Sequence, residues 1–388
     1  MKFYLLLFTL LIWIQKKHVF TLPRDEVLWA LPQTDQQVEA FQDLLNTTEV
    51  ILWQPVVVEN IKKDREVHFY VRASSVNSIK TQLRQLTIQH KVLMGDVQGL
   101  IEKQTINDTV NPRRSSSYYE NYHSMKELSK SPEKSKSAIW IDCGIHAREW
   151  ISPAFCLWFI GHGIHVRERD QTMTTLLEHF DFYVMPVMNV DGYEYTWSHP
   201  SNRLWRKSRS SHGNSKCIGT DMNRNFDARW CGEGASPYEC HEIYCGPYPE
   251  SEPEVKAVAR FIRDHKDAIK AYITMHSYSQ MVLFPYSYTM EKSKDHDELE
   301  SLAKKAAKAI KRTTKKTYRL GPGAQTIYLA PGGSDDWAYD LGIKYSFTIE
   351  LRDTGTYGFL LPPQEIKPTC LEALSAVKEI AKHVLQNL

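Results

Sequence analysis

The sequence predicts an α/β protein with a largely parallel or mixed sheet, preceded by a smaller α+β domain. From residue 138 onward, short apolar runs typical of buried strands alternate with segments of helical periodicity. Before that, residues 26–103 follow the pattern strand, helix, strand, strand, helix, strand. A polar, apolar-poor stretch over residues 107–136 separates the two regions and is typical of a linker or surface loop.

The elements of the smaller region follow from the spacing of its apolar side chains. Residues 49–58 are apolar and β-branched, and residues 66–72 alternate, so both segments predict strands. Residues 34–45 and 76–85 carry apolar side chains at helical spacing and predict helices. The region therefore predicts a small α+β unit of about 80 residues.

The larger region predicts a sheet covered by helices. Its apolar strand-like runs are residues 139–141, 182–185, 271–274 and 345–349. Its segments with helical periodicity are residues 153–162, 252–265, 298–312 and 369–388. Strands that alternate with helices in this way are typical of an α/β sheet.

Composition limits the classes of partner. Apolar residues make up 42% of the chain and charged residues 24%, which is ample for a large core and a second domain. The net charge of +2 gives no bulk attraction to nucleic acid or to a membrane, so neither partner is predicted. Basic runs at residues 304–305 and 311–316 are typical of a solvated helix face.

The N-terminus predicts export from the cell. Lys2 precedes an apolar run over residues 3–14, which is a secretory signal pattern and too short for a membrane span. We expect a signal peptide over residues 1–21. Glycosylation sequons at Asn46 and Asn107 fit an exported chain. Seven cysteines all follow residue 142, so six can form three disulfides in an oxidising compartment, with the pairing left open.

The polar stretch contains a candidate processing site. Arg113 and Arg114 offer a cleavage point for a trypsin-like protease, because proteases prefer such exposed segments. An ordinary basic loop is the alternative interpretation. Cleavage here would divide the mature chain into a propeptide over residues 22–113 and a catalytic domain over residues 114–388.

Three residues suggest a metal site. His146 and Glu149 directly follow a predicted strand, and His276 ends another. A catalytic zinc ion takes three protein ligands and keeps one position open, and α/β sheets build their sites at the carboxyl ends of strands. Taken singly, each residue has a structural alternative: a surface pair for His146 and Glu149, and a packed or capping histidine for His276.

Two carboxylates lie near these candidates. Glu350 ends the strand predicted over residues 345–349 and could accept a proton from water beside a metal. The alternative is an ion pair with Arg352. Asp221 could orient a ligand imidazole, or it could be a turn or capping carboxylate.

The motifs occur together in a family-specific order. They are His146-x-x-Glu149-Trp150, Asn202-Arg203-Leu204-Trp205-Arg206, Asn223-Arg224-Asn225, Met275-His276-Ser277-Tyr278-Ser279 and Thr348-Ile349-Glu350-Leu351-Arg352-Asp353-Thr354-Gly355. In these motifs the chain resembles the funnelin metallocarboxypeptidases of the carboxypeptidase A/B family, over nearly its whole length. The resemblance implies a mixed, eight-stranded type of sheet and one zinc ion per chain.

The resemblance also implies residue roles. His146, Glu149 and His276 would bind zinc, Glu350 would be the general base, and Arg206 would stabilise the oxyanion. Asn223 and Arg224 would bind the terminal carboxylate of the substrate. Further substrate-binding positions are Tyr328, which closes over the bound residue, and Arg148, Ser277 and Tyr278. The disulfides would be Cys143–Cys156, Cys217–Cys240 and Cys231–Cys245, with Cys370 free.

Substrate preference would depend on Asp335, at the position that forms the base of the side-chain pocket in this family. A buried carboxylate there selects a C-terminal Lys or Arg, because an apolar side chain would leave its charge unpaired. Stretches such as residues 51–56 resemble a B-type enzyme of plasma, which implies trimming of fibrin and control of fibrinolysis. That enzyme is cleaved after the arginine that matches Arg113. Because Arg114 follows directly in this chain, which of the two bonds is cleaved stays open. A digestive B-type enzyme is the alternative.

The chain departs from the family before its first catalytic strand. The family has a helix and a β-hairpin here, whereas this chain has only residues 125–137, a shortfall of about 30–40 residues, the size of those elements. We expect the strand at residues 182–187 to become an exposed apolar edge that invites misfolding and aggregation. An inactive or poorly folded shortened isoform is therefore an alternative to an active enzyme.

Overall fold

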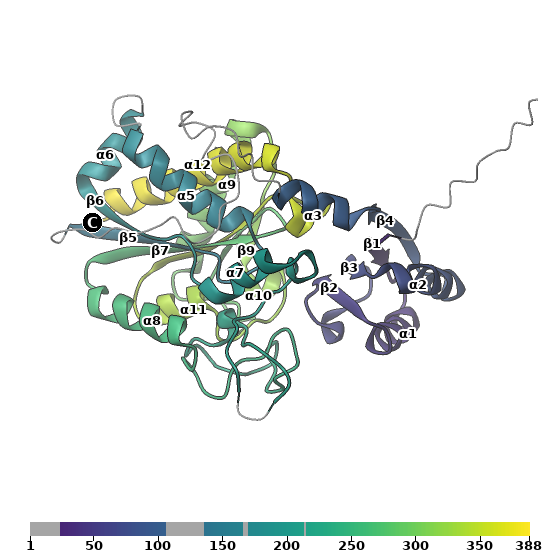
Figure 1. The fold of residues 1–388 in the computed structure, drawn as a ribbon. Helices are drawn as coiled ribbons and strands as arrows, with labels where there is room; N and C mark the ends of the chain where they lie inside the picture. The colour runs from purple at the N-terminus through teal and green to yellow at the C-terminus, as the bar shows by residue number, and fades with distance from the viewer. Residues whose placement is uncertain (1–23, 106–135, 166–169, 213–214) are drawn as a thin grey trace, which may run out of the picture.

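The computed structural model describes residues 24–388 except 106–135, 166–169 and 213–214. Two domains lie side by side, with the smaller one at the N-terminal end of the chain (Figure 1). The predicted signal peptide, Asn107, Arg113 and Arg114 lie outside the described residues. None of the described helices combines the length and apolar character needed to cross a membrane.

The N-terminal domain has the predicted order of elements. Its strands and helices are β1 (Glu26–Leu31), α1 (Asp35–Asn46), β2 (Val50–Gln54), β3 (Val67–Val71), α2 (Ala73–Gln85) and β4 (Gln89–Met94), followed by α3 (Val97–Thr105). The strands form an antiparallel sheet in the order β2-β3-β1-β4. Helix α1 begins where the side chain of Thr34 accepts a hydrogen bond from the Gln37 amide, which satisfies a donor that the first turn leaves free.

Side-chain alternation on β1 gives this small sheet two apolar faces. Leu28 and Ala30 pack with the buried residues of α1 and α2. Val27 points the other way and belongs to a cluster with Trp53, Leu204 and Phe359 of both domains. Because successive strand residues face opposite sides, one sheet can pack its own helices and the neighbouring domain at once.

The large domain is built on a six-stranded sheet in the order β6-β5-β7-β10-β8-β9. These strands are β5 (Ser137–Cys143), β6 (Phe180–Met185), β7 (Ile269–Ser277), β8 (Met281–Phe284), β9 (Arg319–Pro322) and β10 (Tyr345–Leu351). All neighbouring strands run parallel except β10 and β8, so the sheet is mixed as predicted.

Helices cover both faces of this sheet (Figure 1). On one face lie α5 (Ile151–His165), α6 (Gln171–His179), α9 (His296–Thr314) and α12 (Ile366–Gln386). On the other lie α8 (Pro253–His265) and α11 (Ser334–Asp340), with α7 (Val190–Ser198) and α10 (Gly323–Thr326) beside the loops. Alternate residues of β5 join the two layers: Ile139 and Ile141 pack against the first, and Ala138 and Trp140 against the second.

Strand β6 occupies one edge of the sheet. This position is expected, because the segment before β5 is too short to supply the edge strands of the family. Among the described residues it pairs only with β5. The strand spans Phe180–Met185, whereas the sequence predicts residues 182–187. Pro186 explains the earlier end, because proline has no amide hydrogen to donate to a ladder.

The N-terminal domain covers the large domain through aromatic contacts. The ring of Trp53 lies 5.1 Å from that of Phe359 and 6.2 Å from that of Tyr278. His68 Nδ1 lies 3.0 Å from the Tyr278 hydroxyl, and the Ser279 hydroxyl donates to the side-chain oxygen of Gln54 at 3.2 Å. The interface therefore combines a buried apolar cluster with polar contacts, of which the contact between His68 and Tyr278 is itself buried.

This interface should weaken at acidic pH. Burial lowers the pKa of His68 below its usual 6.5, although the charge of Glu66 partly counteracts this effect. The folded protein thus favours neutral His68, so its contribution to stability is present above pH 6.5 and is lost as pH falls below that value. Thermal unfolding of the intact chain should show a smaller loss of stability on acidification in His68→Gln than in the unsubstituted protein. Equal losses in both proteins would contradict this role.

Candidate zinc and catalytic site

The site lies where three parallel strands end together. In the ladder between β7 and β10, His276 is opposite Glu350, and between β5 and β7, Cys143 is opposite Met275. The turn that follows β5 is tied to β7 by Ser152, whose hydroxyl accepts from the Gly144 amide at 2.9 Å and donates to the Met275 carbonyl at 2.5 Å. Pairing in this register brings the carboxyl ends of the strands to one place, where α/β proteins build their sites.

His146, Glu149 and His276 form a compact group whose members are all buried. His146 Nδ1 lies 2.8 Å from one carboxylate oxygen of Glu149, and His276 Nδ1 lies 3.2 Å from the other. The atoms that the three residues offer lie within 4.8 Å of one another. Two imidazole nitrogens and a carboxylate that converge in this way fit one zinc ion, which takes nitrogen and oxygen ligands.

The electrostatics of this group show how strongly its members interact. Burial alone would raise the pKa of Glu149, but His146 and His276 hold it well below its usual range. Burial would lower the pKa of His276, yet the charge of Glu149 and its hydrogen bond raise it to about 9. The carboxylate is thus kept ionised, which is the form that binds a metal.

Asp221 connects His146 to Arg206. Its Oδ1 lies 3.1 Å from His146 Nε2, and its Oδ2 accepts two hydrogen bonds from the Arg206 guanidinium, at 3.1 and 2.8 Å. Although burial would raise the pKa of Asp221, Arg206 and His146 hold it well below its usual range. A carboxylate on the far nitrogen of a ligand imidazole fixes the ring and strengthens it as a ligand.

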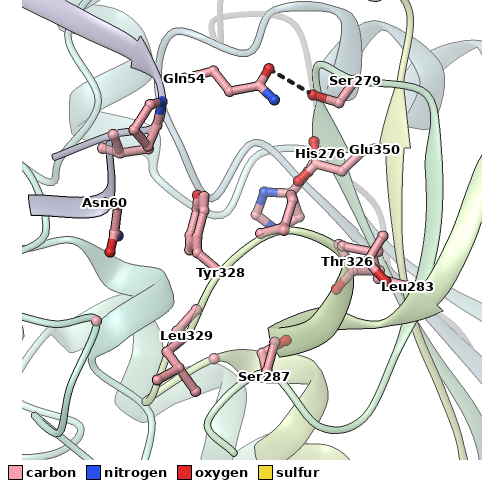
Figure 2. A pocket seen from close by; sticks show the side chains of 18 of the residues that line it. Gln54, Asn60, His276, Ser279, Leu283, Ser287, Thr326, Tyr328, Leu329 and Glu350 are labelled. Atoms are coloured by element: carbon pink, nitrogen blue, oxygen red, sulfur yellow. Dashed lines mark hydrogen bonds between the residues drawn. The ribbon is translucent and has the colours of Figure 1, made fainter. Parts of the chain in front are cut away.

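Glu350 lies beside His276 in the cavity, which Gln54 and Asn60 of the N-terminal domain also line (Figure 2). Burial and the nearby charge of Glu149 raise the pKa of Glu350 to about 8, although His276 counteracts them. The ion pair with Arg352 that the sequence left open does not form, because Arg352 pairs with Glu365 and Glu372 instead. Glu350 is therefore free to act on a group in the cavity.

Asn223, Arg224 and Tyr328 line another part of the same cavity, whose volume is about 520 Å³. Arg224 is buried, with Nε donating to the Gly234 carbonyl and Nη1 to the Asn223 carbonyl, both at 3.0 Å. The Asn223 side-chain oxygen accepts from the Ser334 amide at 3.0 Å. These bonds orient the guanidinium beside Tyr328, whose ring centre lies 6.0 Å from the Arg224 Cζ.

Asp335 lies on the first turn of α11 and is buried at the cavity wall. Thr348 Oγ1 donates to Asp335 Oδ2 at 2.8 Å, and Ser346 Oγ donates to the Asp335 carbonyl at 2.6 Å. Thr348 is not among the site residues predicted from the sequence, although it belongs to a quoted motif. The two-residue repeat of a strand could have indicated Thr348, because residues 346, 348 and 350 share one face of β10.

The remaining predicted residues lie around the site. Ser277 donates its amide to Glu149 at 3.1 Å and lines the cavity. Arg148 is fully buried, 4.4 Å above the Phe359 ring, and Tyr278 is covered by the N-terminal domain. Cys143–Cys156, Cys217–Cys240 and Cys231–Cys245 are disulfides, and Cys370 is a buried free thiol. Asn46 is exposed at the end of α1.

Comparisons with known proteins identify the family. Residues 108–376 match the family described as zinc carboxypeptidase, and residues 28–104 match the carboxypeptidase activation peptide. The chain belongs to this family and carries its activation peptide, so it is a zinc carboxypeptidase zymogen.

Named relatives place the chain among the B-type enzymes. It is 55% identical to rat carboxypeptidase B2 over 423 residues, covering 100% of both chains, and 43% identical to bovine carboxypeptidase B, covering 94% of each. It is similar to a crystal structure of thrombin activatable fibrinolysis inhibitor, with a TM-score of 0.89, 52% identity and coverage of 94% of this chain and 100% of that one. These relationships are consistent with a preference for basic C-terminal residues.

The rat comparison also supports the predicted shortfall. The alignment runs over 423 positions, whereas this chain has 388 residues, so at least 35 positions have no counterpart here. The zinc ligand candidates and Glu350 are nevertheless assembled in one cavity.

Removing the charge of Asp221 should weaken zinc binding. We expect Asp221→Asn to lower zinc affinity about 10- to 100-fold, because the His146 ring loses its orienting carboxylate. Competition titration with a chelator measures this affinity. Asp227→Asn, an exposed aspartate on the loop after Asn223, is the matched control and should bind zinc normally. Unchanged zinc affinity in Asp221→Asn would show that Asp221 does not orient the His146 ring for zinc binding.

Proposed function

We propose that this chain is a secreted zymogen that, after removal of its N-terminal domain, cleaves a C-terminal Lys or Arg from peptides and proteins. The observation that carries the proposal is the joint position of the zinc ligand group, Glu350, Arg224 and Asp335 around one cavity. The first two supply the chemistry, and the last two fit the two charged ends of a basic C-terminal residue.

The reaction would use His146, Glu149 and His276 as the zinc ligands. Zinc would supply a Lewis acid that activates water and polarises a carbonyl group. Glu350 is suited to take up a proton from the attacking water, because its raised pKa of about 8 lies near neutral pH. It would then deliver that proton to the leaving amine.

Arg206 is suited to stabilise negative charge on the scissile carbonyl oxygen. Burial opposes its ionisation, but Asp221 raises the pKa of Arg206 above its usual range, so the guanidinium stays charged. A cation that is already oriented before the reaction costs no reorganisation when charge develops. Asp221 would therefore serve both the zinc ligand His146 and the oxyanion site.

Recognition of the substrate end would depend on Asn223 and Arg224. A guanidinium can bind a carboxylate through two parallel hydrogen bonds, and only a free C-terminus presents that carboxylate. Asp335, oriented by Thr348, would pair with the basic side chain. Tyr328, Arg148, Ser277 and Tyr278 would complete the substrate contacts.

The N-terminal domain would keep the zymogen inactive until a trypsin-like protease cleaves at Arg113 or Arg114. It covers Tyr278 and contributes Gln54, Asn60 and His68 to the cavity wall. The signal pattern and disulfides support an extracellular protein, with Asn46 and Asn107 as glycosylation sites. Similarity to thrombin activatable fibrinolysis inhibitor supports a plasma enzyme that trims fibrin-like substrates and so slows fibrinolysis.

Hydrolysis of two matched peptides, one ending in Arg and one in Phe, tests the proposal. The secreted, trypsin-treated protein should release arginine in preference to phenylalanine, and a zinc chelator should abolish release. Glu350→Gln should lower kcat by about 10²- to 10⁴-fold while keeping its zinc, because it loses only the proton acceptor. A folded, zinc-loaded protein that releases no arginine would refute the activity and favour an inactive isoform.

Asp335 should determine the preference for basic residues. Breaking a buried ion pair costs about 3–5 kcal/mol, so Asp335→Asn should lower kcat/KM for the Arg-ended peptide by roughly 10²- to 5 × 10³-fold. The Phe-ended peptide should be cleaved as well as before, or better. Asp267→Asn, an exposed aspartate after α8, is the matched control. An equal loss with both peptides would show that Asp335 does not select the side chain.

A further inference from the structure

The outer edge of β6 is unusually open for the edge of a sheet. Among the described residues, only β5 pairs with β6, over the ladder from Ser137 opposite Phe180 to Asp142 opposite Met185. Its other side therefore presents backbone groups that no strand in the described part of the chain pairs with. Natural sheets protect such edges with short strands, lysines, prolines or bulges.

The opposite edge of the same sheet shows this protection within its strand, whereas the proline nearest to β6, Pro186, lies just beyond the strand end. Strand β9 has four residues, begins with the exposed Arg319 and ends with Pro322. Strand β6 has six residues, and Asp181 is its only charge. The β6 edge is thus long and nearly uncharged, which makes it suitable for pairing with another strand.

An apolar hollow adjoins this edge on the α5 and α6 side. The hollow has a volume of about 440 Å³ and is lined by Phe159, Ile160, Gly163, Met173, Leu177, Phe182 and Val184. No lining residue carries a charge, so the hollow fits an apolar surface. On the other face of β6, Tyr183 and Met185 are partly buried against the core of the α8 layer.

We propose that the edge of β6 is a self-association surface, at which a second copy of this chain pairs antiparallel about a two-fold axis near Tyr183. The two sheets would then continue into one another. A two-fold interface brings the same surface of both copies together, so the surface must be complementary to itself.

The sequence of β6 meets this requirement. Residues that are directly opposite in an antiparallel pair share one face, so pairing about Tyr183 places Phe182 opposite Val184 of the second copy. Both residues line the hollow, and the hollows of the two copies would merge into one apolar core. Asp181 would lie opposite Met185 of the second copy, so the single charge of each strand does not meet its equivalent.

This surface is separate from the catalytic cavity. No residue of β6, α5 or α6 lines the cavity around the zinc ligands. Self-association would therefore leave that cavity open, and the inference holds whether or not the proposed substrate preference is correct.

Sedimentation velocity of the full-length zymogen over a wide concentration series tests the proposal. We expect a reversible monomer–dimer equilibrium, which Val184→Lys should shift toward monomer by at least about tenfold in Kd, because it places a charge in the merged core. Ser301→Lys, on the exposed face of α9, adds the same charge elsewhere and should leave the Kd unchanged.

Hydrogen exchange of the unsubstituted protein gives a second readout that does not depend on the folding of a variant. Amides of β6 should exchange more slowly as the dimer fraction rises, while those of β9 should not change. A protein that stays monomeric throughout would overturn the proposal. So would a dimer that Val184→Lys does not weaken, or one that forms without protection of β6.

Discussion

The in-register pairing of β7 with β10 is the constraint on which the rest of the site depends. It places His276 opposite Glu350, so a zinc ligand and the candidate base extend from adjacent strand ends. A slip of one residue would turn Glu350 to the opposite face of the sheet. The register is fixed by buried apolar side chains on both faces, and on the β5 side by a hydrogen bond of 2.6 Å from Thr274 Oγ1 to Asp142.

The site buries many charged groups, which is unfavourable unless each group has a partner. Glu149, Asp221, Arg206 and the two histidines are all removed from water. Each is held by an oppositely charged or hydrogen-bonding neighbour, which is the condition under which buried charges are tolerated. Because every member contacts the next, the arrangement is rigid before any substrate arrives, and preorganised charge is the main source of electrostatic catalysis.

Much of the fold and site could be predicted from the sequence, because the signals are local. Strand β7 contains the predicted run at residues 271–274, and α8 and α9 have clear helical periodicity. The ligand candidates follow strands directly, so the sequence alone is enough to predict His146 and His276 at the carboxyl ends of strands. Arg206 and Asp335 required the family resemblance, since nothing local distinguishes them from ordinary loop and helix charges.

Other features depend on contacts between distant segments and could not be predicted. Strands β8 and β9 have only four residues each, too few to show a period. The contact between His68 and Tyr278 joins residues 210 positions apart. The hollow beside β6 combines α5, α6 and a strand edge, so its existence follows from packing rather than from any one segment.

We conclude that the shortened chain still assembles a group of residues that can hold a zinc ion. The zinc content of the purified zymogen, measured by mass spectrometry after dialysis against zinc-free buffer, is the decisive measurement. We expect one zinc ion per folded chain, and none in a folded Glu149→Ala variant. A folded, unsubstituted protein that retains no zinc would show that the strand ends do not hold the three ligands in place.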